Sequence, residues 1–363
     1  MEPEKTWLGS SIPVPCVQEL AKKTTATVPP RYVRADQDPP NISDSTASLP
    51  QVPVIDMQKL FSPEFMDSEL EKLHHASKEW GFFQLINHGV STSLLEKVKL
   101  DLQEFFKLPI EEKKKYWQLP GDLEGFGQAF VVSDEQKLDW GDMFSLVTLP
   151  THLRKPHLLP KLPLPFRDNL EAYSAELENL AIKILELMAK ALRMEYNDMK
   201  NLFEDGWQSI RMNYYPPCPQ LELAIGLNAH SDAVGLTILL QLNEMEGLQI
   251  RKDGMWIPVK PIPNAFIVDI GDILEIVTNG IYRSIEHQAT VNSVKERLSM
   301  ATFYSPRLEG EMGPAPSLIT PETPALFQRI GVVDYFKRLF TRKLDGKSYI
   351  DALRIQNEEQ NGS

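Results

Sequence analysis

Two histidines and an aspartate are the residues in this sequence best suited to hold a metal ion. His230 and Asp232 lie two positions apart at the start of the apolar stretch "AVGLTILLQ". Residues i and i+2 of a β-strand project from the same face, so we expect both side chains to point into one space. Alternation in "RSIEHQA" places His287 on the inward face of another strand. Two imidazoles and one carboxylate are the ligand set of a mononuclear non-haem iron(II) site with open coordination positions.

The same three residues allow other interpretations. A histidine and an acid two positions apart occur often by chance, and His230 could simply be hydrogen-bonded at a strand end. Zinc would accept the same three ligands, with a hydrolytic water in the fourth position. A zinc hydrolase therefore stays open at this point. A non-catalytic jelly-roll binding protein is the third alternative, and the intact set of three ligands disfavours it.

A buried arginine is predicted ten residues after His287. In "ERLSMATFYSP", alternation places Arg297, Ser299 and Phe303 on one side of a strand. An arginine on a core-facing side destabilises the fold unless its charge is paired. A carboxylate would pair with it in a bidentate manner, and the Ser299 hydroxyl would add a hydrogen bond. If no protein acid is placed to do this, we expect the partner to be a diacid cosubstrate.

The strand "RMNYYPPCP" fits the same cavity. Its alternation places Arg211, Asn213 and Tyr215 on one face, and the prolines end the strand. Asn213 and Tyr215 offer polar tips for the same diacid. Considered alone, Tyr215 could equally be a core tyrosine with its hydroxyl at the surface.

The elements that position these residues follow from periodicity and turn signals. Residues 1–50 form a proline-rich leader with one short helix at "VQELAKK", to which we assign little chemistry. Next we expect a strand at "VPVIDM", a helix opened by a Ser68–Glu71 capping box, a buried strand at "GFFQLINHGV" and a helix halted by Pro109. A long helix then braces the sheet over 166–205.

After Trp207 the periodicity changes to two, which predicts a sandwich, barrel or jelly roll. Asp253-Gly254 predicts a hairpin between "LQIRK" and "MWIPV", and Asn279-Gly280 predicts another between "ILEIVT" and "IYRSIEHQA". The segment "VVDYFKRLF" is typical of an amphipathic helix, and the polar end "QNEEQNGS" is expected to fray.

Composition narrows the class of partner. The 363 residues are 42% hydrophobic, and 38 Lys and Arg against 50 Asp and Glu give a net charge of -12. This charge argues against nucleic acid or a membrane surface and favours a small-molecule ligand. Only two cysteines occur, and we find no secretory signal and no transmembrane stretch. We therefore expect a soluble, cytoplasmic, monomeric protein.

The motifs together resemble the plant-type iron(II)/2-oxoglutarate-dependent dioxygenases. H-x-D at 230–232, His287, R-x-S at 297–299 and "NYYPPCP" occur in the family's order. The upstream segments "IPVPCVQELA", "VPPRYVR", "VPVIDM", "KEWGFFQLINHGV", "EEKKKYWQ" and "GFGQAFVVSDEQKLDWGDMF" are similar to its N-terminal region. Within the family the chain is most similar to the senescence-related and S-norcoclaurine-synthase-like subgroup, which includes thebaine and codeine O-demethylases.

This resemblance implies an α+β fold, with a double-stranded β-helix (jelly-roll) core flanked by helices and a mixed helical N-terminal region. The implied division is a leader (1–50), an N-terminal dioxygenase region (51–165), the bracing helix (166–205), the jelly-roll core (206–306) and a C-terminal helical segment with its tail (307–363). It also implies Fe(II) bound by His230, Asp232 and His287, with 2-oxoglutarate held by the residues Arg297, Ser299, Tyr215 and Asn213.

The implied reaction uses 2-oxoglutarate and O2 as cosubstrates, with ascorbate helping to keep the iron reduced, and releases succinate and CO2. It would hydroxylate or O-demethylate an aromatic plant specialised metabolite of alkaloid, flavonoid, phenolic or indole type. Desaturation or ring closure by the same site is an alternative. Phe303, Arg211, Met143 and Ser145 are expected to line the substrate pocket, although each could equally serve core packing.

Overall fold

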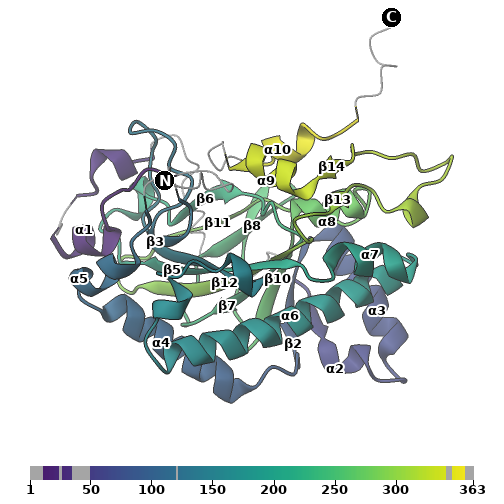
Figure 1. Cartoon of the computed structure of the whole chain (residues 1–363), viewed down its shortest axis with the longest axis horizontal. Helices are drawn as coiled ribbons and strands as arrows, with labels where there is room; N and C mark the ends of the chain where they lie inside the picture. Colours follow the sequence, from purple (N-terminus) through teal and green to yellow (C-terminus); the bar gives the residue numbers. More distant parts are fainter. Residues whose placement is uncertain (1–10, 24–26, 35–49, 120–121, 341–345, 356–363) are drawn as a thin grey trace, which may run out of the picture.

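The computed structural model describes residues 11–23, 27–34, 50–119, 122–340 and 346–355 (Figure 1). The helices are α1 (Val17–Lys23), α2 (Met57–Leu60), α3 (Met66–Glu79), α4 (Thr92–Lys107), α5 (Ile110–Lys113), α6 (Phe166–Ala191), α7 (Tyr196–Phe203), α8 (Asp272–Val277), α9 (Val332–Leu339) and α10 (Ser348–Asp351). The strands are β1 (Val54–Asp56), β2 (Phe82–Ile86), β3 (Gly125–Gly127), β4 (Asp142–Leu149), β5 (Trp207–Tyr215), β6 (Leu227–His230), β7 (Leu236–Gln241), β8 (Leu248–Lys252), β9 (Met255–Pro258), β10 (Phe266–Ile270), β11 (His287–Ala289), β12 (Arg297–Ser305), β13 (Glu311–Met312) and β14 (Ile330–Gly331).

Two sheets form the core. The larger has the strand order β1-β2-β10-β7-β12-β5-β4-β3, and the smaller has the order β6-β11-β8-β9. Residues of both sheets line one shared cavity, so the sheets face each other across it. This arrangement confirms the predicted α+β class with a jelly-roll core.

The central pair of the large sheet determines which side chains enter the cavity. β5 and β12 are antiparallel, with Tyr215 opposite Arg297 and Asn213 opposite Ser299. Alternate residues of both strands line the cavity, as predicted. The intervening Leu298 belongs instead to the hydrophobic core on the other side of the sheet.

Helices cover the outer face of the large sheet. α6 has 26 residues, which at about 1.5 Å per residue makes it about 39 Å long. In Figure 1 it runs along the sheet with α3 and α4 beside it, and α6 contacts both of those helices and strands β4, β7 and β12. The single helix predicted over 166–205 is two helices, because Arg193 takes a left-handed conformation (φ 55°) between α6 and α7.

The predicted capping box at Ser68 and Glu71 is wrong. α3 begins earlier, at Met66, and the Ser68 hydroxyl donates to the Phe65 carbonyl at 2.9 Å. A side-chain cap exists instead on α2, where Asp56 Oδ1 accepts from the Gln58 backbone N–H at 3.0 Å. A short turn separates these two helices. The spacing of polar residues alone did not reveal this turn.

One of the two predicted hairpins is confirmed. Asp253 (φ 50°) and Gly254 (φ 80°) connect β8 and β9, with both residues in the left-handed conformation that such turns require. The other is wrong, because the predicted strand "ILEIVT" lies in helix α8, in which every residue is buried. Asn279 and Gly280 end this helix with positive φ. The acidic residues Asp272 and Glu275 of this helix are buried with the apolar ones, so no exposed polar face reveals its period, and a short buried run cannot be assigned to strand or helix from periodicity.

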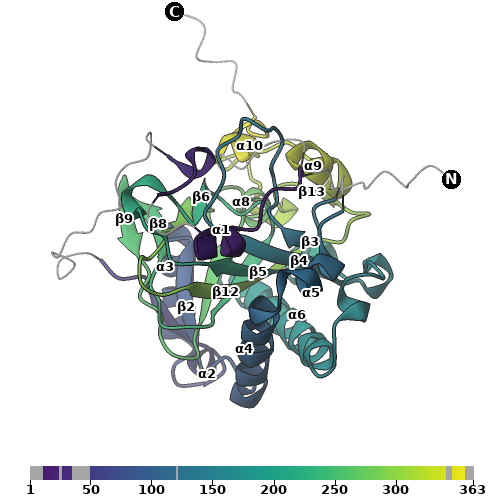
Figure 2. The ribbon, with the colours of Figure 1, turned by 90° about the vertical axis from the view of Figure 1, so that its left-hand side faces the viewer.

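The described parts of the leader pack tightly onto the core, more than the sequence suggested. The predicted helix α1 is present, and the N–H groups of Val17 and Gln18 each donate to the Asp142 carboxylate at 2.8 Å. Val17 and Tyr32 share a buried cluster with Trp140. Figure 2 shows α1 lying across the strands of the core. The tail "QNEEQNGS" lies outside the described residues.

None of the described helices has both the length and the apolar character that a membrane span requires.

Candidate active site

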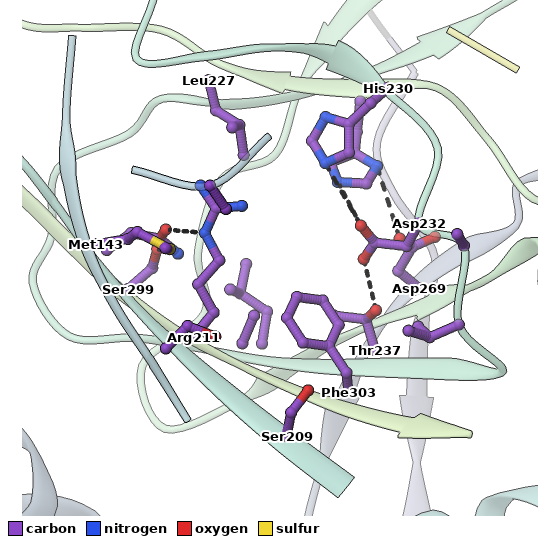
Figure 3. Close-up of a pocket in the computed structure, with 18 of the residues that line it drawn as sticks. Met143, Ser209, Arg211, Leu227, His230, Asp232, Thr237, Asp269, Ser299 and Phe303 are labelled. Carbon is purple, nitrogen blue, oxygen red and sulfur yellow. Dashed lines mark hydrogen bonds and ion pairs between the residues drawn. The ribbon is translucent and has the colours of Figure 1, made fainter. Parts of the chain in front are cut away.

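The cavity between the sheets has about 1290 Å³ of empty space, including its open mouth. Three of its walls matter for chemistry. One is formed by the ends of β6 and β11, a second by the inner faces of β5 and β12, and a third by β4 together with Phe336 of α9 and Phe340 just after it. Figure 3 shows how the labelled side chains point into this space.

The structure brings the three predicted metal ligands together. Asp232 Oδ1 lies 3.4 Å from His230 Nε2 and 3.7 Å from His287 Nε2. One ligand atom from each residue lies within 4.8 Å of the other two. His230 ends β6 and His287 begins β11, and the two residues are directly paired in the small sheet.

Asp232 reaches the site by a different route from the predicted one. β6 ends at His230, so Asp232 lies in the loop before β7 and does not share a strand face with His230. Its position is fixed by the loop backbone, since the Asp272 N–H donates to the Asp232 carbonyl at 2.7 Å. The convergence was predicted correctly, whereas the strand geometry given as its cause was wrong.

Backbone carbonyls fix both imidazoles. His230 Nδ1 lies 2.7 Å from the Asn228 carbonyl oxygen, and His287 Nδ1 lies 3.4 Å from that of Ile285. A carbonyl can only accept, so each Nδ1 carries a proton, and Nε2 is the nitrogen that each histidine presents to the ligand centre. The Phe82 ring packs edge-on against His287, with ring centroids 5.3 Å apart.

The electrostatics of the three groups suit a divalent cation. Burial, together with the neighbouring His230, lowers the pKa of His287 to about 4, so this imidazole is neutral at pH 7. Burial alone would raise the pKa of Asp232, but the two imidazoles and a hydrogen bond from Thr237 more than offset it and hold the pKa below its usual range. A neutral imidazole at His287 and an ionised carboxylate at Asp232 are the protonation states that metal binding requires of these two ligands. The donor set of two nitrogens and one oxygen therefore fits Fe(II).

Thr237 and Asp269 support the site and were missed by sequence reasoning. The Thr237 hydroxyl donates to Asp232 Oδ2 at 2.5 Å, which turns Oδ1 toward the histidines. Asp269 Oδ2 lies 3.6 Å from His287 Nδ1, and burial, then the charge of Asp232, raises the pKa of Asp269 well above its ordinary value. The available signal was alternation, because both residues face the cavity from paired strands β7 and β10.

Arg297 is buried, with 3% of its surface exposed. Its NH1 lies 3.5 Å from Ser299 Oγ and its NH2 lies 3.3 Å from Gln241 Oε1, while no described residue offers its Nε a hydrogen-bond partner. The Tyr215 ring lies beside the guanidinium, 5.4 Å away. In the described part of the chain no carboxylate forms an ion pair with Arg297. Among the described residues its partners are thus neutral groups, namely Ser299, Gln241 and the Tyr215 hydroxyl, and its charge faces the cavity.

The residues around Arg297 are neutral hydrogen-bonding groups. Asn213 Nδ2 lies 3.5 Å from Ser299 Oγ, and Gln241 is opposite Ser299 on the neighbouring strand β7. Burial raises the pKa of the Tyr215 phenol, so its hydroxyl stays protonated at neutral pH. A cation among neutral donors in a closed wall of the cavity is a suitable anchor for one carboxylate.

The four predicted pocket residues all line the cavity. Phe303 lies on β12, and Met143 and Ser145 lie on β4, where they are paired with Asn213 and Arg211 of β5. The Arg211 guanidinium donates through Nε to Asn213 Oδ1 at 2.8 Å. These positions make a continuous wall from the anchor region toward the mouth.

A group of aromatic residues in the cavity lining was not predicted. Phe130 stacks on Phe340, with centroids 5.7 Å apart, and Phe340 stacks in turn on Phe336 of α9 at the same spacing. Phe336 also packs edge-on against Trp207, 5.0 Å away. The helix α9 was predicted from its amphipathic pattern, but the pattern does not say which cavity its apolar face closes.

Two family models match the chain. The model of the 2OG-Fe(II) oxygenase superfamily matches residues 206–306, and the model described as non-haem dioxygenase in morphine synthesis N-terminal matches residues 52–162.

Relatives are similar over nearly the whole length. Oxoglutarate-dependent flavonoid 7-O-demethylase 1 of Ocimum basilicum is 60% identical over 98% of this chain and 94% of its own. Codeine O-demethylase of Papaver somniferum is 56% identical over 96% of this chain and 98% of its own. A crystal structure of JOX2 in complex with 2OG, Fe and JA superposes with a TM-score of 0.87 and 34% identity, covering 95% of this chain and 99% of that one.

Proposed function

Because the chain belongs to the 2OG-Fe(II) oxygenase superfamily, we propose that it oxidises an aromatic small molecule by hydroxylation or O-demethylation. The protein is a 2-oxoglutarate-dependent dioxygenase, and its cofactor and cosubstrates are Fe(II), 2-oxoglutarate and O2.

We assign His230, Asp232 and His287 as the iron ligands and Arg297 as the anchor of 2-oxoglutarate. The observation that carries this assignment is the buried Arg297 charge, which has no carboxylate partner among the described residues and faces the same cavity as the three ligand atoms. The distal carboxylate of the cosubstrate supplies that partner, with Ser299, Tyr215 and Asn213 as neutral hydrogen-bonding groups around it.

Iron bound together with 2-oxoglutarate supplies the oxidising chemistry, in which O2 is reduced as the keto acid loses CO2 and becomes succinate. The three protein ligands leave the remaining coordination positions open to the cosubstrates. Arg297 fixes the far end of the keto acid, so the near end is held in one orientation. Thr237 keeps Asp232 turned toward the ligand centre, and the apolar side chains around it limit the access of water.

The cavity walls select which C–H bond reaches the iron. Phe303 and Met143 offer an aromatic and a flexible apolar surface to a planar ring system, with Ser145 beside them. The Arg211 guanidinium is placed to donate to an oxygen of the substrate. When the oxidised carbon belongs to a methoxy group, the product is a hemiacetal, which releases formaldehyde and leaves a hydroxyl on the ring.

The relatives support this substrate class. One is named for demethylating a flavonoid at the 7-O position and another for O-demethylating codeine. Desaturation or ring closure would use the same ligands and anchor, so the reaction outcome depends on how the walls present the substrate. A zinc hydrolase is not supported by the comparisons, and it would give no role to Arg297.

We further propose that the protein acts as a cytoplasmic monomer without nucleic acid or membrane partners, and that ascorbate keeps its iron reduced. The net charge of -12 supports the absence of polyanionic partners. Cys16 and Cys218 are both free and buried, in keeping with a reducing compartment. Light scattering after size-exclusion chromatography tests the monomer.

The test of function is aerobic turnover by protein that has been loaded anaerobically with Fe(II). A panel of methoxylated flavonoids and alkaloids is added with 2-oxoglutarate, and succinate and the substrate masses are followed. We expect stoichiometric succinate with gain of one oxygen or loss of one methylene. Loading with Zn(II) is the control. Absence of both iron binding and turnover, or turnover with zinc alone, would overturn the proposal.

A further inference from the structure

We propose that Arg34, in the N-terminal leader, is a positioning residue for the iron site. It holds Asn228, the residue whose carbonyl oxygen orients the His230 imidazole. This inference rests on the proposed function only in taking His230 as an iron ligand. In this role the N-terminal leader helps to orient a metal-binding histidine of the core.

The contacts form one continuous chain from the leader to the ligand. Arg34 NH2 donates to Asp139 Oδ1 at 2.9 Å, and Arg34 NH1 donates to Asn228 Oδ1 at 3.3 Å. The Asn228 backbone N–H hydrogen-bonds to the same aspartate. On the other side of this residue, the Asn228 carbonyl accepts from His230 Nδ1 at 2.7 Å. Asn228 is therefore held through its side chain, its N–H and its carbonyl.

The backbone at Asn228 needs this support because the sheet does not supply it. β6 is the edge strand of the small sheet and pairs within that sheet with β11. The register between them is irregular, since Leu227 is opposite Ala289 and His230 is opposite His287, so three steps on one strand match two on the other. Asn228 lies inside this bulge, where ladder hydrogen bonds are disrupted. Its orientation then depends on contacts from outside the sheet.

Arg34 is well suited to supply them. Only 14% of its side chain is exposed, and its planar guanidinium reaches two acceptors at once in a fixed geometry. Its own backbone is anchored nearby, because the Arg34 N–H donates to the Leu223 carbonyl at 2.7 Å. Figure 2 shows the purple leader passing over the end of the core where β6 lies. The guanidinium thus connects the leader, which is anchored to the core, to Asn228 in the bulged segment of β6.

Removal of the guanidinium should weaken iron binding without unfolding the protein. Groups that orient a metal-binding histidine typically change metal affinity by about 10–100-fold when they are lost. Arg34 acts through Asn228, one contact farther away, so we expect the Fe(II) dissociation constant to rise by about 5–10-fold in Arg34→Gln.

Arg31 offers a matched control. It lies in the same leader segment and is bound to the core by comparable contacts, from Nε to the Gln136 carbonyl at 3.1 Å and from NH2 to the Ser133 carbonyl at 2.9 Å. Neither contact reaches Asn228. Arg31→Gln therefore loosens the leader without touching the support of His230.

The experiment is an anaerobic titration of the full chain with Fe(II) at saturating 2-oxoglutarate. It follows the charge-transfer absorption of the chelated keto acid, and thermal unfolding of the metal-free protein is measured in parallel. We expect weaker iron binding in Arg34→Gln, partial recovery in Arg34→Lys and an unchanged constant in Arg31→Gln. Arg34→Gln also loses its ion pair with Asp139, so its metal-free melting temperature should be lower than that of Arg31→Gln, and the iron constants are compared at a temperature at which every variant is folded. Equal iron constants in Arg34→Gln and the wild type, or equal losses in Arg34→Gln and Arg31→Gln, would overturn the inference.

A second variant keeps the test decisive if Arg34→Gln does not fold. Asn228→Ala removes the acceptor of Arg34 but keeps the carbonyl that orients His230. We expect the same loss of iron affinity, and no further loss in the double variant where that can be made, because both changes break the same Arg34–Asn228 hydrogen bond. Unchanged iron affinity in Asn228→Ala would refute the positioning role. A wild-type protein that binds no iron would instead refute the proposed function itself.

Discussion

Replacement of Arg297 by methionine tests whether this residue anchors the cosubstrate or stabilises the fold, because the two roles predict different effects on the stability of the metal-free protein. The guanidinium is 3% exposed, its Nε has no hydrogen-bond partner among the described residues, and its other nitrogens lie 3.3 Å and 3.5 Å from neutral oxygens. Methionine has a similar length and carries no charge.

The expected magnitude follows from these contacts. Breaking a buried ion pair destabilises a protein by about 3–5 kcal/mol, whereas replacing a poorly compensated buried charge by an apolar side chain is neutral or stabilising. We therefore expect the free energy of unfolding of metal-free Arg297→Met to stay within about 1 kcal/mol of the wild type or to increase. Binding of 2-oxoglutarate should lose about 2–5 kcal/mol, the usual effect of removing one partner of a buried charge pair. That loss corresponds to a dissociation constant raised by about 30-fold to several thousand-fold.

Two measurements test this prediction. Urea unfolding of the metal-free protein gives stability, and anaerobic calorimetry of the Fe(II)-loaded protein gives the 2-oxoglutarate affinity. Arg251→Met is the control, since Arg251 lies on β8 with half of its side chain exposed and pairs with Glu286 at 3.0 Å. Its free energy of unfolding and its 2-oxoglutarate affinity should both change little. A variant destabilised by about 3 kcal/mol or more, with 2-oxoglutarate affinity intact, would show that Arg297 is structural and refute the reasoning.

Three further predictions concern separate parts of the molecule. Thr237→Val removes the 2.5 Å hydrogen bond to Asp232, so Fe(II) affinity measured by anaerobic titration should fall about tenfold; an unchanged affinity would contradict the role given to Thr237. Phe303→Ala should raise the KM for an accepted aromatic substrate about tenfold through lost ring contact, whereas the KM for the keto-acid cosubstrate should not change; equal changes in both would argue against a substrate wall. Burial lowers the pKa of His88, whose Nδ1 accepts from the Val90 N–H at 3.2 Å. Below the ordinary pKa of about 6.5 the unfolded state binds the proton more readily, so this residue's contribution to stability should be lost as pH falls from about 7 to 5. In urea unfolding at pH 7 and pH 5, the free energy of unfolding should fall less in His88→Asn than in the wild type. An equal fall in the two proteins would contradict the role given to His88.

The parts of the site that could be predicted are those that lie on regular strands. Alternation in β5 and β12 placed Tyr215, Asn213, Arg297 and Ser299 on one inner face, and the register confirms that they are neighbours. Every second residue of a strand lies on the same face, so a register shift of two residues leaves the inward-facing set unchanged. A charged residue between apolar ones also has few environments in which it can be buried.

The parts that could not be predicted depend on loops and long-range packing. Asp232 lies beyond the end of β6, so no strand periodicity governs its direction. Every residue of α8 is buried, including the acidic Asp272 and Glu275, so no exposed face distinguishes helix from strand there. Alternation can place Thr237 on the cavity side of its strand, but the sequence does not show that its hydroxyl donates to Asp232.

Contacts between residues far apart in the sequence could not be predicted either. Arg34 in one chain end and Phe340 near the other reach the site through tertiary contacts with residues far away in sequence, Asn228 and Phe130. Composition identifies the leader as proline-rich, but it does not indicate which surface the leader covers.

Anomalous diffraction at the iron edge from crystals grown anaerobically with Fe(II) and 2-oxoglutarate tests the central claim most directly. We predict one iron peak in contact with His230 Nε2, Asp232 Oδ1 and His287 Nε2, and a keto acid that reaches from this metal to Arg297 with its distal carboxylate on the guanidinium. An iron peak away from these three atoms, or a keto acid whose distal carboxylate lies away from Arg297, would contradict the account.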